Sequence, residues 1–282
     1  MIKTYYLLTK PGIIVGNAIT VAAGVALASK GNLDFWLFLE TLVGLSLVIA
    51  SACVFNNYID READKKMERT KNRALAKGMI SVNRALIFAI LLGIVGFVIL
   101  SLYTNLLTVL CALAGFLIYV VLYSFWKYHT TYGTIIGSIA GAVPPVVGYT
   151  AVTNHFDFGA FLLFLILVLW QMPHFYSIAM YRFDDYTAAS IPILPIKKGV
   201  SITKIHMLCY IIAFILTSLM LFFFGYTGHI YLIIATIFGI SWLLLCMKGF
   251  KSQNTKRWGR QMFVLSLFVV TALCVTMAID VI

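Results

Sequence analysis

Charged residues are scarce in this 282-residue chain: Asp, Glu, Lys and Arg make up 11% of it, against 62% hydrophobic residues. The mean hydropathy is +0.97. A water-soluble domain needs a largely polar surface, so this composition excludes one and indicates a polytopic membrane protein in a lipid bilayer. A net charge of +11 could suggest nucleic acid, but no basic surface domain carries it, so nucleic acid is not an expected partner.

Cysteine is also scarce, and it occurs in no pattern that forms a site. The five cysteines stand singly inside apolar runs, without a CxxC pair or metal-ligand spacing. This excludes a disulfide framework and a redox role, and the thiols are expected to be small buried hydrophobes.

Long apolar runs are abundant. Nine are long enough to cross a hydrocarbon core of about 30 Å as helices, which predicts an all-α polytopic membrane protein. They cover residues 11–29, 35–58, 85–102, 106–126, 132–152, 158–181, 204–226, 229–247 and 261–280.

The basic residues are distributed unevenly between the two sides that these spans define. Of the 21 Lys and Arg residues, 20 fall on the side of the N-terminus and only Lys30 falls on the other. Because short cytoplasmic loops carry an excess of Lys and Arg, the N-terminus is expected inside and the C-terminus outside. Segments 59–84 and 182–203 then face the cytoplasm.

The charged residues that do occur gather after the second span. On a helix, Asn57, Asp60 and Asp64 stand at i, i+3 and i+7, which places an amide and two carboxylates on one face. Three oxygen donors suit a hard cation such as Mg²⁺, which takes further ligands from a substrate phosphate. Arg69, Lys71 and Arg73 follow and are donors of the kind that hold phosphate oxygens, so the stretch predicts a diphosphate site. The alternative is a solvated loop with paired charges.

A second acidic segment follows the sixth span and contains Asp184, Asp185 and Lys198. If both segments cap one cavity, their carboxylates could hold metal ions on one diphosphate. A solvated loop is again the alternative reading.

Polar residues inside the spans are informative because unsatisfied polar groups are costly in lipid. The first span begins at Lys10-Pro11 and carries Asn17, and the fourth carries Tyr119 and Tyr123 near its inner end. The sixth contains Gln171-Met172-Pro173-His174. His174 could be a hydrogen-bonded core residue, a haem-iron ligand or a proton-handling group.

Residues 56–64, N-N-Y-I-D-R-E-A-D, resemble the first acidic motif of the UbiA superfamily of intramembrane prenyltransferases, N-D-x-x-D-x-x-x-D, with Asn57 in place of the first Asp. The second motif of the superfamily, D-x-x-x-D, becomes Asp184-Asp185-Tyr186-Thr187-Ala188 here. These departures, together with the blocks 144–149 and 170–174, resemble the branch of the superfamily that modifies haem. The resemblance covers almost the whole chain.

The resemblance implies a single domain, residues 1–282, in a bacterial inner membrane: a UbiA-type bundle of nine helices with two cytoplasmic cap loops. The implied reaction transfers a farnesyl group from farnesyl diphosphate to a vinyl group of haem B, adds water and releases diphosphate, with Mg²⁺ assisting. A haem-modifying enzyme or a terminal oxidase is a further expected partner.

The same resemblance implies the roles of individual residues. The metal ligands would be Asn57, Asp60, Asp64, Asp184 and Asp185. His174 would contact haem or guide the water. The substrates would be bound by Lys10, Asn17, Asn56, Arg61, Arg69, Lys71, Arg73, Tyr119, Tyr123, Asp184 and Lys198.

Two alternatives remain open on the sequence. A related prenyltransferase could use an aromatic acid or a quinone precursor as acceptor, with the same diphosphate site and no dependence on haem. A secondary transporter could also have broken helices and an intramembrane His, but its charged residues would be expected near the middle of the bilayer.

Overall fold

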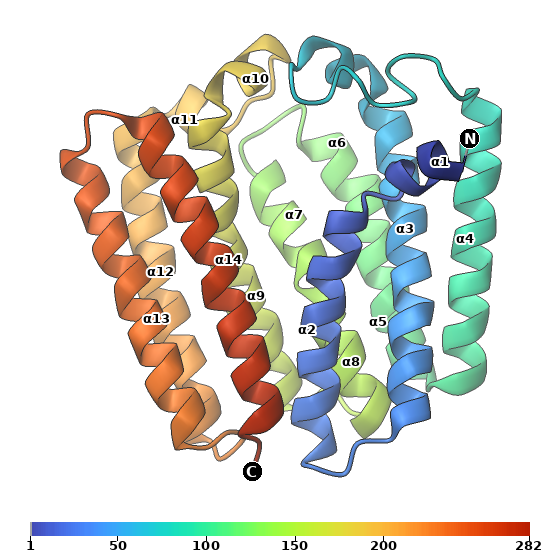
Figure 1. Ribbon diagram of the computed structural model, residues 1–282, viewed down its shortest axis with the longest axis vertical. Helices are drawn as coiled ribbons and strands as arrows, with labels where there is room; N and C mark the ends of the chain where they lie inside the picture. Colours follow the sequence, from blue (N-terminus) through green and yellow to red (C-terminus); the bar gives the residue numbers. More distant parts are fainter. Residues whose placement is uncertain (1) are drawn as a thin grey trace.

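The chain folds into a bundle of long helices with several short helices at one end, as the computed structural model of residues 2–282 shows (Figure 1). The elements are α1 Ile2–Leu8, α2 Pro11–Ser29, α3 Phe35–Lys66, α4 Val82–Tyr103, α5 Leu106–Leu117, the π-helix η1 Ile118–Tyr123, α6 Ser124–Trp126, α7 Gly133–Gly141, α8 Val143–Thr153, α9 Phe158–Tyr181, α10 Phe183–Ala188, α11 Leu194–Lys197, α12 Val200–Phe223, α13 His229–Lys248, the 3₁₀ helix η2 Gly249–Lys251 and α14 Thr255–Ile279.

The nine predicted spans are confirmed within residues 2–282, where nine helical segments are long and apolar enough to cross a membrane. Their outward faces are apolar, as on α4, where Leu91 and Ile94 are each 56% exposed. Such a surface suits contact with lipid and would be unfavourable in water. The chain is therefore a multi-pass membrane protein.

One boundary differs from the prediction, and one span is broken at a proline pair. The second span was expected to end at residue 58, but α3 continues to Lys66, so the first acidic motif lies on the helix itself. The fifth span is two helices, α7 and α8, which meet at Ala142, two residues before Pro144. The pair Pro144-Pro145 predicts a break at this point. Proline lacks an amide hydrogen and interrupts the helical hydrogen bonding at this point.

Two long helices are capped at their N-termini by aspartates, at the end of the bundle opposite the short helices. Asp34 accepts hydrogen bonds from the amides of Trp36 and Leu37, and Asp157 accepts them from Gly159 and Ala160. These side chains satisfy amides that begin a helix and have no partner within it. Acidic residues are few in this chain, and these two are accounted for by helix capping.

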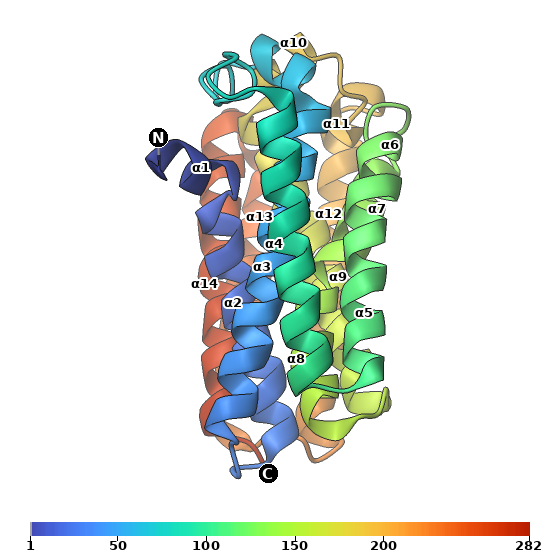
Figure 2. The ribbon, with the colours of Figure 1, turned by 90° about the vertical axis from the view of Figure 1, so that its right-hand side faces the viewer.

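The other end of the bundle carries α10, α11 and the loop between α3 and α4, which lie together there in both views (Figures 1 and 2). We call this the cap end. The N-terminal part of the described chain lies toward the cap end and the C-terminus lies at the opposite end. The two acidic segments predicted from the sequence therefore meet at one end of the molecule.

Small residues let α2 and α8 approach closely at the centre of the bundle. A Cβ added at Gly24 would lie 2.1 Å from the carbonyl oxygen of Pro145, and one added at Gly148 would lie 2.4 Å from that of Val21. Close contact of this kind replaces the hydrophobic effect as the main cause of helix association in lipid.

We predict that Gly24→Ala lowers thermal stability, because the new methyl group meets backbone and the two helices must separate. The expected cost is about 1–3 kcal/mol, as for other overpacked interiors. Gly16→Ala on the same helix is the matched control, since a Cβ there meets nothing within 4 Å, and it should leave stability unchanged or slightly raised. Thermal unfolding of both variants in detergent tests this, and equal melting temperatures would contradict the proposed contact.

Candidate active site

A cavity of about 820 Å³ opens within the cap half of the bundle. Its wall is built from α2, α3, α5, η1, α7, α8, α9, α10 and α14 and from the loops at the cap end. Its charged residues come from the C-terminal turns of α3 and from segments that precede α2 or follow α3 and α6. Farther in, the wall is apolar and includes Leu45, Val48 and Ala112. The cavity therefore offers a charged head and a hydrophobic interior.

The C-terminal turns of α3 supply the acidic face of this cavity. Asn56, Asp60 and Asp64 line it at i, i+4 and i+8, and all three are buried. The structure does not place Asn57 on this face, contrary to the sequence prediction: its amide nitrogen donates to the carbonyl oxygen of Leu8 at 2.7 Å. Helical spacing allows either asparagine to share a face with the two carboxylates. The contact of Asn57 with α1 therefore decides that Asn56 lines the cavity.

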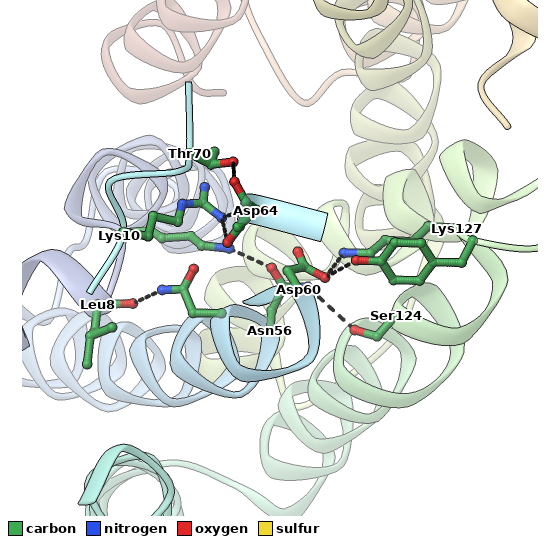
Figure 3. Close-up of polar contacts among 11 residues, drawn as sticks. Leu8, Lys10, Asn56, Asp60, Asp64, Thr70, Ser124 and Lys127 are labelled. Atoms are coloured by element: carbon green, nitrogen blue, oxygen red, sulfur yellow. Dashed lines mark hydrogen bonds and ion pairs between the residues drawn. The ribbon is translucent and has the colours of Figure 1, made fainter. Parts of the chain in front are cut away.

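Each buried carboxylate is paired with a basic residue from another element (Figure 3). Asp60 Oδ1 accepts from Lys127 Nζ and, at 2.8 Å, from the hydroxyl of Tyr128. Asp64 accepts from Arg73 Nη1 through both oxygens, at 2.8 and 3.0 Å. These contacts join α3, the loop after it and the segment after α6 around one charged site.

Lys10 approaches the same site from the start of α2. It occupies the left-handed backbone region, with φ of 53°, and its Nζ donates to Asn56 Oδ1 at 2.5 Å. Burial lowers the pKa of Lys10 to about 8, and burial likewise lowers the pKa of Lys127. Buried ammonium groups are unfavourable without an anionic partner. Lys127 has such a partner in Asp60, whereas Lys10 contacts only an amide oxygen and is therefore poised to interact with a bound anion.

The charge balance of the cavity is positive. The wall contains four cationic side chains, Lys10, Arg69, Arg73 and Lys127, against the two carboxylates of α3. Arginine and lysine donors in this number are suited to the oxygens of a phosphate group. The excess of cations therefore favours binding of a highly charged anion such as a diphosphate.

The structure places several other predicted residues away from the cavity wall. Asp184 is exposed and pairs with Lys256 at 3.3 Å, while Lys71 pairs with Glu68 at 2.6 Å. Arg61 donates to the carbonyl oxygen of Tyr58 and stacks on its ring. Lys198, at the end of α11, is also outside the wall. None of these side chains is directed into the site.

Asp185 has a different place from the one expected. It is buried, and its Oδ1 accepts from the backbone amide of Glu68 at 2.9 Å. It thus connects α10 to the loop after α3 and is not part of the cavity wall. Asp184 and Asp185 are neighbours on a short helix, so they point to different sides and cannot both enter one site.

Aromatic and polar residues complete the wall. Tyr119 and Tyr123 stack on each other, with ring centroids 5.4 Å apart and an interplanar angle of 16°, on the π-helix η1. Such π-bulges recur at functional sites. Asn17 also lines the cavity, although its amide donates to the carbonyl oxygen of Ile13. His174 faces the cavity from α9.

Part of the wall faces the surrounding lipid. Ile13 on α2 and Leu267 on α14 both line the cavity, and each is 42% exposed on an apolar surface. The two helices diverge toward the cap end (Figure 1). The cavity wall between α2 and α14 is therefore partly exposed on the apolar outer surface of the bundle.

Lys127 is the most important residue that the sequence prediction missed. The one available signal was that it is the only Lys or Arg in the segment 127–131, directly after the span that carries Tyr119 and Tyr123. Sequence spacing cannot show that it reaches Asp60, because 67 positions separate the two residues.

We predict that Lys127→Met lowers turnover by roughly 10- to 100-fold, since one positive charge of the cavity, where we expect diphosphate to bind, is removed. Lys256→Met is the control, because Lys256 pairs with the exposed Asp184 outside the cavity, and its turnover should stay within about twofold, as expected for an exposed pair. Steady-state assays on both variants test this. Equal losses in the two would show that general surface charge matters and the cavity position does not.

The fold and this site define an intramembrane prenyltransferase. The sequence matches the UbiA prenyltransferase family over residues 17–269, and the chain belongs to that family.

Similar proteins agree with this assignment. The chain is 56% identical to a protoheme IX farnesyltransferase of Protochlamydia amoebophila over 99% of both chains, and 56% identical to one of Edwardsiella ictaluri, over 99% of this chain and 95% of that protein. Among solved structures, a digeranylgeranylglyceryl phosphate synthase aligns with a TM-score of 0.81 at 21% identity, covering 99% of this chain and 98% of that one. A UbiA homologue of Archaeoglobus fulgidus bound to GPP and Mg²⁺ aligns with a TM-score of 0.73 at 14% identity, covering 97% and 99%.

Proposed function

We propose that this chain transfers a farnesyl group from farnesyl diphosphate to a vinyl group of protohaem IX, with addition of water and release of diphosphate. The observation that carries the proposal is the 53–56% identity, over 99% of this chain, to several proteins named protoheme IX farnesyltransferase. The cavity supports it, because a cationic head above an apolar interior suits a diphosphate with a long hydrocarbon chain.

Asp60 and Asp64 are the residues that we expect to hold Mg²⁺. Both protein contacts of Asp60 go to Oδ1, which leaves Oδ2 of this cavity-lining residue without a protein partner in the described chain. Carboxylate oxygens of this kind fit a hard divalent cation that also takes phosphate ligands. When bound, Mg²⁺ would neutralise charge on the diphosphate leaving group. A divalent ion together with a prenyl diphosphate in the related archaeal structure supports this assignment.

The chain's own residues would act on the two ends of the allylic diphosphate. Lys10, Arg69, Arg73 and Lys127 would bind the leaving group, where negative charge grows as the carbon–oxygen bond breaks. The stacked rings of Tyr119 and Tyr123 line the same cavity, and their faces would stabilise positive charge on the allylic carbon. A porphyrin vinyl group would then attack that carbon through its terminal CH₂, and no covalent enzyme intermediate is needed.

The proposal places the protein in a bacterial inner membrane. The distribution of Lys and Arg supports cytoplasmic cap segments, where soluble Mg²⁺ and diphosphate can exchange. The product remains in the membrane, so transfer to a haem-modifying enzyme or a terminal oxidase is an expected next step. The transporter alternative lacks support, because the chain belongs to a prenyltransferase family.

The remaining alternative, a different acceptor, is tested in vitro with two candidate acceptors in separate reactions. Purified protein in lipid nanodiscs is supplied with labelled farnesyl diphosphate, Mg²⁺ and either protohaem IX or 4-hydroxybenzoate. Label should appear in the porphyrin only. Transfer to the aromatic acid, with protohaem left unmodified, would overturn the proposed acceptor while keeping the prenyltransferase assignment.

A further inference from the structure

Two polar side chains of α9 face the cavity within an otherwise apolar part of its wall. Gln171 and His174, at i and i+3, line the cavity and are only 5% and 8% exposed. Residues three apart lie on the same face of a helix. Polar groups at membrane depth are unfavourable unless they are paired or functional, so both side chains need an explanation.

Ser266 on α14 is the hydrogen-bond partner of His174 Nδ1. Its hydroxyl donates to the carbonyl oxygen of Phe263 at 2.6 Å, and its oxygen lies 2.7 Å from His174 Nδ1. A hydroxyl has one proton to donate, so when it is given to Phe263 the serine oxygen accepts a hydrogen bond from Nδ1–H. The neutral imidazole then carries its lone pair on Nε2.

The imidazole ring is also held firmly in place. Trp170 stacks on it, with centroids 4.6 Å apart and an interplanar angle of 25°, and the indole nitrogen donates to the backbone carbonyl of Ser266 at 2.9 Å. One residue of α14 therefore fixes two neighbouring side chains of α9. Rigid placement of this kind is what an acid or base in a site requires.

His174 Nε2 and the Gln171 amide are left for a ligand in the cavity. Within the described chain neither group has a hydrogen-bond partner in the protein. Neither is among the fully inaccessible polar atoms that lack a partner. The absence of a side chain at Gly141 leaves room for the Gln171 amide itself, since a Cβ there would lie 2.1 Å from Gln171 Oε1.

We propose that Gln171 and His174 hold the water molecule that adds to the porphyrin side chain, with His174 as the base and Ser266 as its positioning residue. This inference rests on the proposed function. An ordered water in a protein needs at least two polar partners, which this pair supplies. An iron ligand would need only the imidazole, so the neighbouring amide favours water.

The steps balance as follows. The vinyl π electrons form a carbon–carbon bond to the farnesyl carbon as its bond to diphosphate breaks, which leaves a cation next to the macrocycle. The water oxygen forms a bond to that carbon, and one of its protons passes to His174 Nε2. Diphosphate or bulk water later removes the proton. Without a placed water, the cation would lose a proton to give an alkene that lacks the hydroxyl group.

The test measures the ratio of hydrated to unhydrated farnesyl porphyrin by chromatography with mass detection. His174→Asn keeps an amide N–H near the position of Nδ1 and removes the acceptor at Nε2. We expect the ratio to fall by roughly 100-fold, in the range of general-base effects, while farnesyl diphosphate is still consumed. Ser266→Ala and Gln171→Met should lower the ratio by smaller factors, and His174→Gln, with a polar group near Nε2, should partly restore it.

Ser218→Ala is the matched control, because this buried serine donates to the carbonyl of Phe214 on α12, away from the cavity, and its ratio should equal that of wild type. An unchanged ratio in His174→Asn and Gln171→Met would overturn the inference. So would an imidazole–iron spectrum of bound protohaem that is lost only in the His174 variants. If His174→Asn does not fold, the Gln171→Met ratio decides. Absence of any farnesyl porphyrin from wild type would instead overturn the proposed function.

Discussion

Asp60→Asn should reduce farnesyl transfer by about 10²- to 10³-fold, several kcal/mol of activation free energy, because it removes a carboxylate from the proposed metal site. Asp60 is central in the charged head of the cavity, since it contacts both Lys127 and Tyr128. The amide is nearly isosteric, so packing changes little. Transfer is measured with labelled farnesyl diphosphate in reconstituted membranes.

The control for this variant is Asp184→Asn. Asp184 is also a cap-end carboxylate paired with a lysine, but it is exposed and lies outside the cavity. Its loss should change transfer by less than about twofold, as for other exposed pairs. Size-exclusion profiles of both variants show whether they fold. A fully active Asp60→Asn protein would remove Asp60 from the metal site.

Removal of divalent metal should have an effect of similar size. Treatment of the purified protein with EDTA should lower transfer by at least about 100-fold, because four cationic side chains alone would have to stabilise the leaving diphosphate. Added Mg²⁺ should restore activity. Ca²⁺ should restore it poorly, since it prefers more ligands at longer distances.

The binding of diphosphate gives a separate readout for the same treatment. Lys10, Arg69, Arg73 and Lys127 line the cavity, so inorganic diphosphate should still bind to the metal-free protein, with lower affinity. Full transfer activity in EDTA, with metal analysis showing no bound divalent ion, would contradict the proposed role of Mg²⁺.

Much of the fold could be predicted because the bilayer imposes a simple requirement. Each crossing needs a long apolar helix, and all nine were found from hydropathy. The break before Pro144 could also be predicted, because proline cannot continue the hydrogen-bonding pattern. The extension of α3 to Lys66 could not be predicted from hydropathy, since the charged end of a helix resembles a loop by composition.

The site could be predicted only in part. Asp60 and Asp64 share a helical face by spacing alone, and the structure places both in the cavity. The choice between Asn56 and Asn57 depends on α1, whose Leu8 carbonyl accepts the Asn57 amide. Helical spacing carries no information about that contact.

Contacts between distant segments account for the rest of what the sequence could not show. Lys127 reaches Asp60, Asp185 binds the amide of Glu68, and Ser266 orients His174. In each pair the partners are 67 or more positions apart. A single sequence shows which residues can form such bonds, but the packing of the helices decides which do.

The most direct test of the account is the haem composition of membranes from cells that over-express the chain. Haems are extracted and separated by reversed-phase chromatography with mass detection, beside cells that express Asp60→Asn at the same level. A more hydrophobic haem with the mass of a hydroxyethylfarnesyl adduct should appear with the wild-type chain and be absent with the variant. Unmodified haem B alone in both, with well-expressed protein and sufficient farnesyl diphosphate, would contradict the proposed function.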